Sequence, residues 1–315
     1  MLRTVLMIVR VGMIVTICKL FVPRNNILQR EERKLPEAPE LAYSRDRLRK
    51  IVGERLITKM TPGEKGRYTK KRPEGFDKII LDLPLKVESI DTKGKFMYWT
   101  LTGRSGARWY MHCSYGMSGG WYTGESGHTA FIVHHNVSGS EITRDLMPLF
   151  FNDPRHFGTI KFVDSEKVHE KKLGTLGPCI LTPGLTPEIF AGNVLRKQDR
   201  PICEALMDQS VISGVGNYLR AEALYHCKVN PWARVTELSS DDYVRLHSSI
   251  LSIAKDSYTS QGATISTYRT VDGTKGTTQF DFHVYGKKSD PDGREVVSRQ
   301  DANGRTMHWC PSVQK

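Results

Sequence analysis

The sequence predicts an α+β protein in which a β-rich domain, opened by one helix, precedes a helical domain with a terminal hairpin. Residues 54–165 contain alternating or apolar runs that are typical of strands. Beyond residue 188, helix-start signals and helical spacing take over. Residues 173–188 are dense in glycine and proline, which is typical of a linker. A chain of 315 residues is long enough to bury a core in each part.

The composition indicates a soluble globular protein with a polyanionic partner. Hydrophobic residues make up 39% of the chain and charged residues 25%. Lysine and arginine total 46 against 34 acidic residues, which gives a formal net charge of +12. Such a basic balance points first to nucleic acid and second to an anionic membrane. A solubilising surface charge is the plain alternative.

The cysteines favour neither a disulfide framework nor a structural zinc site. They are scattered singly and form no CxxC pair, which fits a protein of a reducing compartment. The six are Cys18, Cys113, Cys179, Cys203, Cys227 and Cys310.

Residues 1–35 differ in character from the rest of the chain. Val5 to Val22 is mainly apolar, but Arg10 and Lys19 make it a poor membrane-spanning helix. A secretory signal lacks a small-residue cleavage site here, and the arginine-rich, acid-poor character fits a mitochondrial transit peptide somewhat better. A further option is that translation starts at Leu35, since some leucine codons can initiate. The residues alone leave these options open.

The first half of the chain predicts one helix and then strands. From Glu40 to Val52 the large apolar residues fall on one helical face, and Gly53 suits the end of this helix. The basic run GEKGRYTKKRPEG (63–75) predicts a loop. Strands are predicted from the runs KIILDLPL (78–85), KFMYWTL (95–101) and AFIVHHNV (130–137).

The second half carries helix-start signals. Thr186 is an N-cap candidate with Pro187 behind it. Ser239 and Asp242 resemble a capping box that opens a helix reaching about Ser260. Further helices are predicted over 201–208 and 217–227, and a hairpin over 284–314.

The run SGVGNYLRAEALY (213–225) is the most informative local motif. Gly214 and Gly216 bracket a tight turn, and Asn217 opens the next helix. Backbone N–H groups at such a helix start form a phosphate site, although an ordinary helical corner has the same pattern. In a chain this basic, phosphate binding is the favoured interpretation.

The segment RPICEALMDQSVISGVGNYLRAEALYHC (200–227) closely resembles the helix–two-turn–helix of the Fpg/Nei family, the formamidopyrimidine-DNA glycosylases and endonuclease VIII. Within this segment, the stretch GNYLRAE (216–222) is most similar to the zinc-less Nei-like branch. Further blocks match in the family's order: PEAPE (36–40), KGKF (93–96), YGMSG (115–119), DPRHFG (153–158), VYGKK (284–288) and GRTMHWCP (304–311).

The resemblance implies a fold with an N-terminal helix and β-sandwich domain, then a helix–two-turn–helix domain with a zinc-less finger. The expected parts are an extension (1–35), the β-sandwich catalytic domain (36–172), a linker (173–188), the helix–two-turn–helix domain (189–283) and the finger hairpin (284–315).

The resemblance also implies a bifunctional DNA glycosylase and abasic-site lyase whose nucleophile is the amine of Pro36 as the first residue. Attack at C1′ of the damaged nucleotide would expel the base and leave an iminium on the enzyme. Inside a chain the Pro36 nitrogen is a tertiary amide with a delocalised lone pair and cannot attack. Initiation at Leu35 would place a removable methionine directly before Pro36, and we favour this over a cleaved transit peptide.

The family's other catalytic and DNA-binding roles carry over by position. Glu37 matches the carboxylate that handles protons at the opening sugar. Lys95 and Arg305 are expected in the catalytic set and, with Asn217, should grip phosphates beside the lesion. Glu40 is a weaker candidate, for contact with the lesion. Outside the resemblance, a first-turn glutamate and a strand lysine have ordinary structural explanations.

Three further residues match the family's void fillers, which enter the gap left by a flipped-out nucleotide: Met117, Arg155 and Phe157. On their own, Met117 and Phe157 would be taken for core residues. The Nei-type wording favours oxidised pyrimidines and hydantoins as substrates. The longish loop over 262–282 lies where family members cap 8-oxoguanine, so 8-oxoguanine and formamidopyrimidines stay candidates.

The finger departs from the family's zinc pattern. SDPDGRE (289–295) replaces the first CxxC pair, and Cys310 is one cysteine where the second pair has two. A lone thiol cannot form a tetrahedral site, so neither zinc nor another cofactor is expected.

The expected partner is damaged double-stranded DNA, with single-stranded or bubble DNA as further substrates. We expect an intracellular monomer on DNA, in the nucleus or nucleoid, without stable membrane association. Mitochondrial targeting by residues 1–35 stays an option. If Pro36 stays internal, the alternative is a protein that binds damaged or abasic DNA without cutting it.

Overall fold

The computed structural model describes residues 36–64, 66–136, 146–262, 270–273 and 282–315. The options raised for residues 1–35, and most of the loop over 262–282, lie outside the described residues. Residues 32–315 form one unit by their internal contacts. Within the described residues, no helix is both long and apolar enough to cross a membrane.

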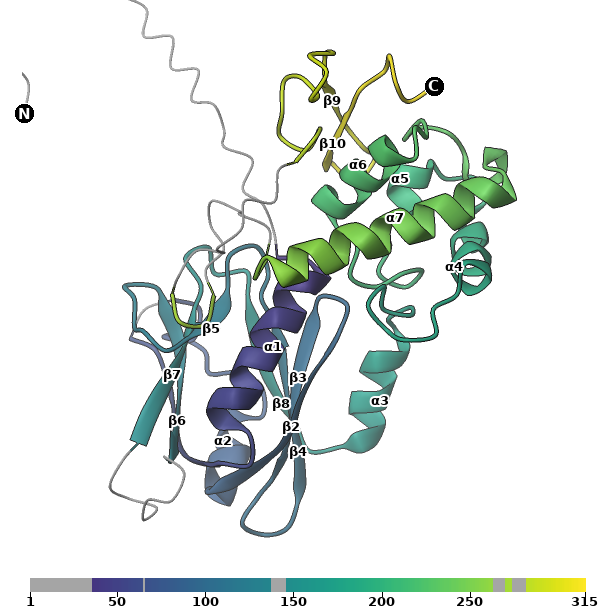
Figure 1. Ribbon diagram of the computed structural model, residues 1–315. Helices are drawn as coiled ribbons and strands as arrows, with labels where there is room; N and C mark the ends of the chain where they lie inside the picture. The colour runs from purple at the N-terminus through teal and green to yellow at the C-terminus, as the bar shows by residue number, and fades with distance from the viewer. Residues whose placement is uncertain (1–35, 65, 137–145, 263–269, 274–281) are drawn as a thin grey trace, which may run out of the picture. The chain divides into compact units, whose positions relative to one another are not determined.

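The N-terminal half forms an eight-stranded antiparallel sheet in the order β5-β7-β6-β1-β2-β3-β4-β8 (Figure 1). The strands are β1 (Leu56–Pro62), β2 (Leu85–Lys93), β3 (Phe96–Thr102), β4 (Arg108–Ser114), β5 (Gly120–Tyr122), β6 (Thr129–Asn136), β7 (Leu146–Asn152) and β8 (Thr159–Val163).

The sheet folds over itself into a sandwich. Trp99 of β3 and Trp121 of β5 are far apart in the strand order, yet their ring centroids lie 5.5 Å apart. Phe131 of β6 and Phe162 of β8 are likewise in contact, at 5.8 Å. Register shifts in the ladders of β1, β2 and β6 mark irregular points at which such a sheet can bend. The predicted α+β class and the β-sandwich are confirmed.

One predicted strand is wrong. Residues 78–85 are not a strand, because α2 (Phe76–Ile79) and a 3-10 turn η1 (Ile80–Asp82) occupy most of the run. Gly75 adopts the left-handed conformation that starts α2. Pro84 keeps Leu83 extended, so β2 begins only at Leu85.

The C-terminal half is helical, and its predicted caps are present. The Thr186 side chain accepts a hydrogen bond from Ile189 N, and Ser239 with Asp242 forms the capping box. The helix predicted over 201–208 is a single turn. The elements are α3 (Glu166–Gly174), α4 (Pro187–Val194), η2 (Leu195–Lys197), α5 (Ile202–Ala205), α6 (Asn217–His226), η3 (Val235–Glu237) and α7 (Ser240–Thr259).

The chain ends in a hairpin of β9 (Val297–Gln300) and β10 (Thr306–Trp309), as predicted. Asp301 accepts the backbone N–H groups of Asn303 and Arg305 and so shapes the turn between these strands. The fully buried Arg220 of α6 donates to Asp301 at 2.8 Å and to the Thr306 carbonyl. The hairpin turn is therefore fixed to α6.

Helix α1 (Ala38–Val52) joins the two cores, and it contacts β2, β3 and α7. Ala38 belongs to the core of the helical half, whereas Leu41 and Leu48 belong to the core of the sandwich. The first turn of α1 therefore lies where the two cores meet.

Candidate active site at the start of helix α1

Pro36 and Glu37 are buried where the chain enters α1. The N–H of Glu37 donates to Glu40 Oε2 at 2.8 Å. The next N–H, of Ala38, donates to the Gly214 carbonyl at 3.1 Å. The first bond closes the first turn of α1, and the second holds the start of α1 against the turn that precedes α6.

The Glu37 carboxylate occupies the N-terminus of α6. Its Oε1 accepts the N–H of Tyr218 at 2.9 Å and its Oε2 accepts that of Leu219 at 3.3 Å. These two backbone N–H groups belong to the helix start for which we predicted phosphate binding. They instead bind a carboxylate of the same chain, so the prediction of a phosphate site is wrong for these two groups. The physical preference of a helix start for an anion is nevertheless the one expected.

The protonation of Glu37 is balanced near neutrality. Burial raises its pKa to about 7, although the Lys95 ammonium and the two backbone N–H groups oppose the rise. Burial also lowers the pKa of Lys95, and the charge of Glu37 opposes that shift. A carboxyl group with a pKa near the working pH can both donate and accept a proton.

Close backbone approach brings Lys95 and Glu37 together. Lys95 lies with Gly94 in the turn between β2 and β3. A Cβ on Gly94 would lie 2.7 Å from Gly214 N, nearer than real Cβ atoms come to other atoms. A Cβ on Gly216 would lie 2.3 Å from both the Glu37 carboxyl carbon and Lys95 Nζ. Glycine is therefore needed where the strand turn meets the turn before α6.

Glu40 is fully buried behind this site. Its Oε1 lies 3.1 Å from the Tyr218 hydroxyl of α6 and accepts from Ser257 Oγ of α7 at 2.9 Å. Because its Oε2 accepts the Glu37 N–H, one carboxylate holds the starts of α1 and α6 against α7.

Lys95, Asn217 and Arg305 form no side-chain hydrogen bond or ion pair with any described residue. Asn217 begins α6, and its Oδ1 is buried without a partner in this part of the chain. Arg305 is exposed at the end of the β9–β10 turn, and its charge lowers the pKa of Lys95. Two cations and an amide are thus free to bind an anion.

Met117, Arg155 and Phe157 lie together on two neighbouring loops. Arg155 Nη2 lies 2.8 Å from Met117 Sδ, and its guanidinium lies 5.5 Å from the centre of the Phe157 ring. Phe157 is 56% exposed, which is unusual for so large an apolar side chain. Gly116, with φ +58°, allows the first loop to touch the backbone of the second.

The loop over 262–282 is described only in part. Val271 is buried in the core of the sandwich, and its carbonyl accepts the Thr123 N–H at 2.9 Å. Asp272 pairs with Arg47 of α1. The described stretch 270–273 is therefore anchored to the sandwich.

Comparison with known proteins agrees with this arrangement. The formamidopyrimidine-DNA glycosylase N-terminal domain matches residues 35–160, and the H2TH domain of the same glycosylases matches residues 176–269. The formamidopyrimidine-DNA glycosylase of Bdellovibrio bacteriovorus is 30% identical over 285 residues, which span 89% of this chain and 100% of the relative. The chain belongs to the formamidopyrimidine-DNA glycosylase family.

Other members of the glycosylase family are similarly related. The protein of Exiguobacterium sibiricum is 28% identical over 291 residues, 89% of this chain and 99% of its own. The MutM (FPG) structure from Thermus thermophilus shares 28% identity with a TM-score of 0.72, covering 89% of this chain and 98% of its own. A Lactococcus lactis FPG structure has the same fold, with a TM-score of 0.74. It is 23% identical and covers 89% of this chain and 100% of its own.

Sequence reasoning missed the residues that position the candidate site. Tyr218 and Arg220 lie inside the quoted 200–227 block, but their partners are distant in sequence. Ser257 could have been noticed, because it lies four residues after Ile253 on the apolar face of α7 and is fully buried. A buried serine on such a face indicates a buried polar partner.

Proposed function

We propose that this chain is a bifunctional DNA glycosylase and abasic-site lyase that removes oxidised bases during base excision repair. One observation carries the proposal: directly after Pro36 stands a buried carboxyl group, Glu37, with a pKa near 7 beside the Lys95 ammonium. Membership of the formamidopyrimidine-DNA glycosylase family supports DNA as the partner.

The proposed nucleophile is the amine of Pro36 in a form of the protein that begins there. Its lone pair attacks C1′, and the bond from C1′ to the base breaks as the base leaves with a proton. The C1′–O4′ bond then opens, O4′ takes a proton from Glu37, and an iminium forms between Pro36 and the sugar. Loss of the C2′ proton and of the 3′ phosphate completes the elimination, with the Glu37 carboxylate as the base.

Lys95, Asn217 and Arg305 are proposed to bind the phosphates that flank the damaged nucleotide. They come from the β2–β3 turn, the start of α6 and the β9–β10 turn, and their side chains have no protein partner among the described residues. Two cations and an amide fit phosphate oxygens well. With its phosphates held in this way, the DNA backbone would place C1′ of the damaged nucleotide next to Pro36.

Met117, Arg155 and Phe157 are proposed to fill the space left in the duplex when the nucleotide flips out. Their mutual contacts and the exposure of Phe157 support insertion between bases, because an apolar wedge offsets part of the lost stacking. Glu40 has its oxygens on protein donors, so we propose that it positions α1 and does not contact the lesion.

For the lesion, we propose oxidised bases in double-stranded DNA, with oxidised pyrimidines and hydantoins favoured. The stretch GNYLRAE (216–222) and the absence of the first CxxC pair from the sequence support placing this chain in the zinc-less Nei-like branch. The relatives are named for formamidopyrimidine, so a substrate panel must contain formamidopyrimidines and 8-oxoguanine as well. We also propose that the finger hairpin folds without zinc, with Cys310 buried and its Sγ 3.2 Å from Ser312 Oγ.

The test is borohydride trapping on duplex DNA with one abasic site. Two proteins are compared, the full chain and a chain that begins at Pro36, whose first residue is verified by mass spectrometry. We expect a covalent adduct for the chain beginning at Pro36 and none for the full chain, because the Pro36 nitrogen can form an iminium as a free amine but not as a tertiary amide.

The matched control is a chain with one glycine in front of Pro36. It keeps every side chain but returns the proline nitrogen to an amide, so it should bind the DNA and give no adduct. Because Pro36 is internal in the full chain, a non-catalytic binder of damaged or abasic DNA is the second candidate. Failure of the Pro36 form to trap, together with tight binding of abasic DNA, would establish that second function.

A further inference from the structure

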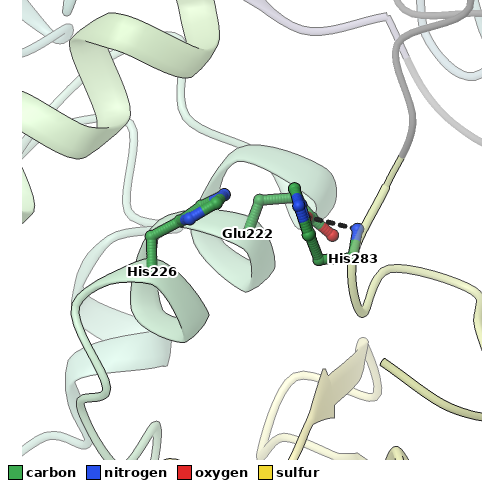
Figure 2. A group of neighbouring side chains, drawn as sticks. All are labelled: Glu222, His226 and His283. Carbon is green, nitrogen blue, oxygen red and sulfur yellow. Dashed lines mark hydrogen bonds and ion pairs between the residues drawn. The ribbon is translucent and has the colours of Figure 1, made fainter. Parts of the chain in front are cut away.

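We propose that Glu222, His226 and His283 form a binding site for one divalent transition-metal cation, with zinc the first choice. The site joins α6 to the segment that leads into the finger hairpin. Each residue offers one ligand atom, and these atoms all lie within 4.8 Å of one another. Figure 2 shows His283 beside the Glu222 carboxylate, with His226 one turn further along the helix.

The helix sets two of the three ligands. Glu222 and His226 are four residues apart on α6, so their side chains project from the same face. His283 follows Phe282, which is buried in the core of the helical half, and its position is fixed by its own N–H to Glu222 Oε2 at 2.9 Å. Two ligands thus come from a rigid helix and the third from a segment anchored to it.

One edge of the coordination shell is already present. His283 Nδ1 lies 3.2 Å from Glu222 Oε2. Two ligand atoms of a tetrahedral zinc, with bonds of about 2.0 to 2.1 Å, stand about 3.3 Å apart. The exposed His226 side chain can rotate to bring its nitrogen closer. A water molecule would complete the tetrahedron.

The electrostatic environment favours a cation. The Glu222 carboxylate is fully buried, and among the described residues its only ion-pair partner is His283. Hydrogen bonds from the backbone N–H groups of residues 283–285 offset part of the cost of burying this charge, but no described lysine or arginine neutralises it. A bound cation would supply the missing positive charge.

Glu222 also has a purely structural role, which does not account for His226. Its Oε1 accepts the N–H groups of Val284 and Tyr285, at 3.0 and 2.8 Å, so the carboxylate would be needed without any metal. His226, in contrast, makes only ring contacts, with Tyr225 and His283, and its nitrogens bind no described residue. Its ring stands 4.7 Å from the His283 ring, centre to centre.

Two imidazoles and one carboxylate suit zinc better than magnesium or calcium, which prefer oxygen ligands. Copper and nickel also bind imidazole, and the flexible His226 imposes no square-planar geometry that would select them. The proposal departs from our expectation, drawn from the cysteines, that the chain binds no zinc. It concerns α6 and leaves the finger hairpin itself without metal.

The test measures metal binding on untagged, EDTA-treated full chain, so it does not depend on the proposed glycosylase activity. Zinc titrated by calorimetry should bind at one per chain, and cobalt(II) should give the intense visible absorption of a tetrahedral site. Zinc at a hundred times Kd should raise Tm by about 5 °C. Magnesium should neither bind in the calorimetric titration nor raise Tm.

His226→Ala is the decisive variant, because this exposed side chain supports no other described residue. It should weaken zinc binding at least tenfold and abolish both the cobalt band and the rise in Tm. His283→Ala should do the same, whereas His128→Ala, at an exposed histidine in the sandwich, should change nothing. No stoichiometric binding by the wild-type chain, or a loss smaller than tenfold in His226→Ala, would overturn the proposal.

Discussion

At Glu37 two opposing effects act on a single carboxyl group. Burial favours the neutral acid, while the start of α6 and the Lys95 ammonium favour the anion. The result is a group that titrates near pH 7, where a surface glutamate would be ionised. We conclude that the position of this residue at the junction of both cores tunes its acidity.

Glu37→Gln should separate the titration of this group from every other pH effect. The folded protein binds more protons than the unfolded chain between pH 4.5 and about 7, because the pKa of Glu37 is raised. The free energy of unfolding of the wild type should therefore fall, relative to the variant, by up to about 3 kcal/mol as the pH rises through this window. Denaturant titrations at several pH values measure it, and parallel pH profiles for the two proteins would refute the shift.

The same variant should lower the rate of strand cleavage at an abasic site by about a hundredfold or more, since it cannot exchange a proton. Single-turnover assays with the chain beginning at Pro36 measure this rate. Abasic-DNA binding should stay within a few-fold of the wild type, because Glu37 is buried and binds no phosphate.

Gly216→Ala tests the close approach of Glu37 and Lys95. The new Cβ would overlap both groups at 2.3 Å, so the site must open. We expect a loss of cleavage activity of at least tenfold and a lower Tm. Gly192→Ala is the matched control, since that exposed glycine of α4 has open space around its Cα and should be neutral or stabilising. Equal behaviour of the two variants would contradict the packing argument.

Among the elements, the β9–β10 turn depends on one buried ion pair. Asp301 and Arg220 are both fully buried, and hydrogen bonds from Arg305 N and Arg220 lower the pKa of Asp301 against the effect of burial. The stabilisation from this carboxylate is therefore present at neutral pH and is lost as the pH falls through its lowered pKa.

Asp301→Asn should destabilise the protein by about 3 to 5 kcal/mol, because it leaves a buried guanidinium without its counter-charge. Abasic-DNA binding should weaken as well, since Arg305 is carried on the same turn. Chemical denaturation and fluorescence anisotropy measure the two effects. Asp292→Asn, a 70% exposed aspartate of the same hairpin region, should change stability by no more than about 0.5 kcal/mol.

Local signals predicted elements well where the physical cause is itself local. The Thr186 cap and the Ser239 capping box were predicted because each joins groups three residues apart. The run at 78–85 was assigned wrongly because its apolar character fits both a strand and a buried helical turn. There the conformation of Gly75 decided the outcome, and a glycine does not reveal the sign of its φ in a sequence.

Across the whole molecule, the basic charge should appear as a salt dependence of DNA binding. The chain has a net charge of +12, and phosphate contacts release counterions. Arg305→Ala should lower the slope of log K against log salt by about 1 and weaken binding equally for all sequences. Lys86→Ala is the control, because Lys86 lies about 23 Å from the Lys95 end of β2. An unchanged slope for Arg305→Ala would contradict the proposal that Arg305 binds a DNA phosphate together with Lys95 and Asn217.

The order of the two domains and the family were predictable from the sequence, because several separate blocks match in order. The assembled site was not. Glu37 meets Leu219 and Glu40 meets Ser257 across 182 and 217 residues, and no periodicity or spacing encodes such contacts. The Glu37 carboxylate on the start of α6 is the clearest case, since both partners were singled out separately but never joined.

The buried hydrogen bond between Glu40 and Ser257 has a consequence for folding during synthesis on the ribosome. Helix α1 is made first, yet one partner of Glu40 is 217 residues further along the chain. At about 5 to 20 residues per second, that partner is polymerised roughly 10 to 40 seconds later. Until then the Glu40 carboxylate lacks its partner on α7, although the Gly214 and Tyr218 partners of the first turn of α1 are made earlier. The contacts that complete the candidate site are therefore all available only when translation has nearly finished.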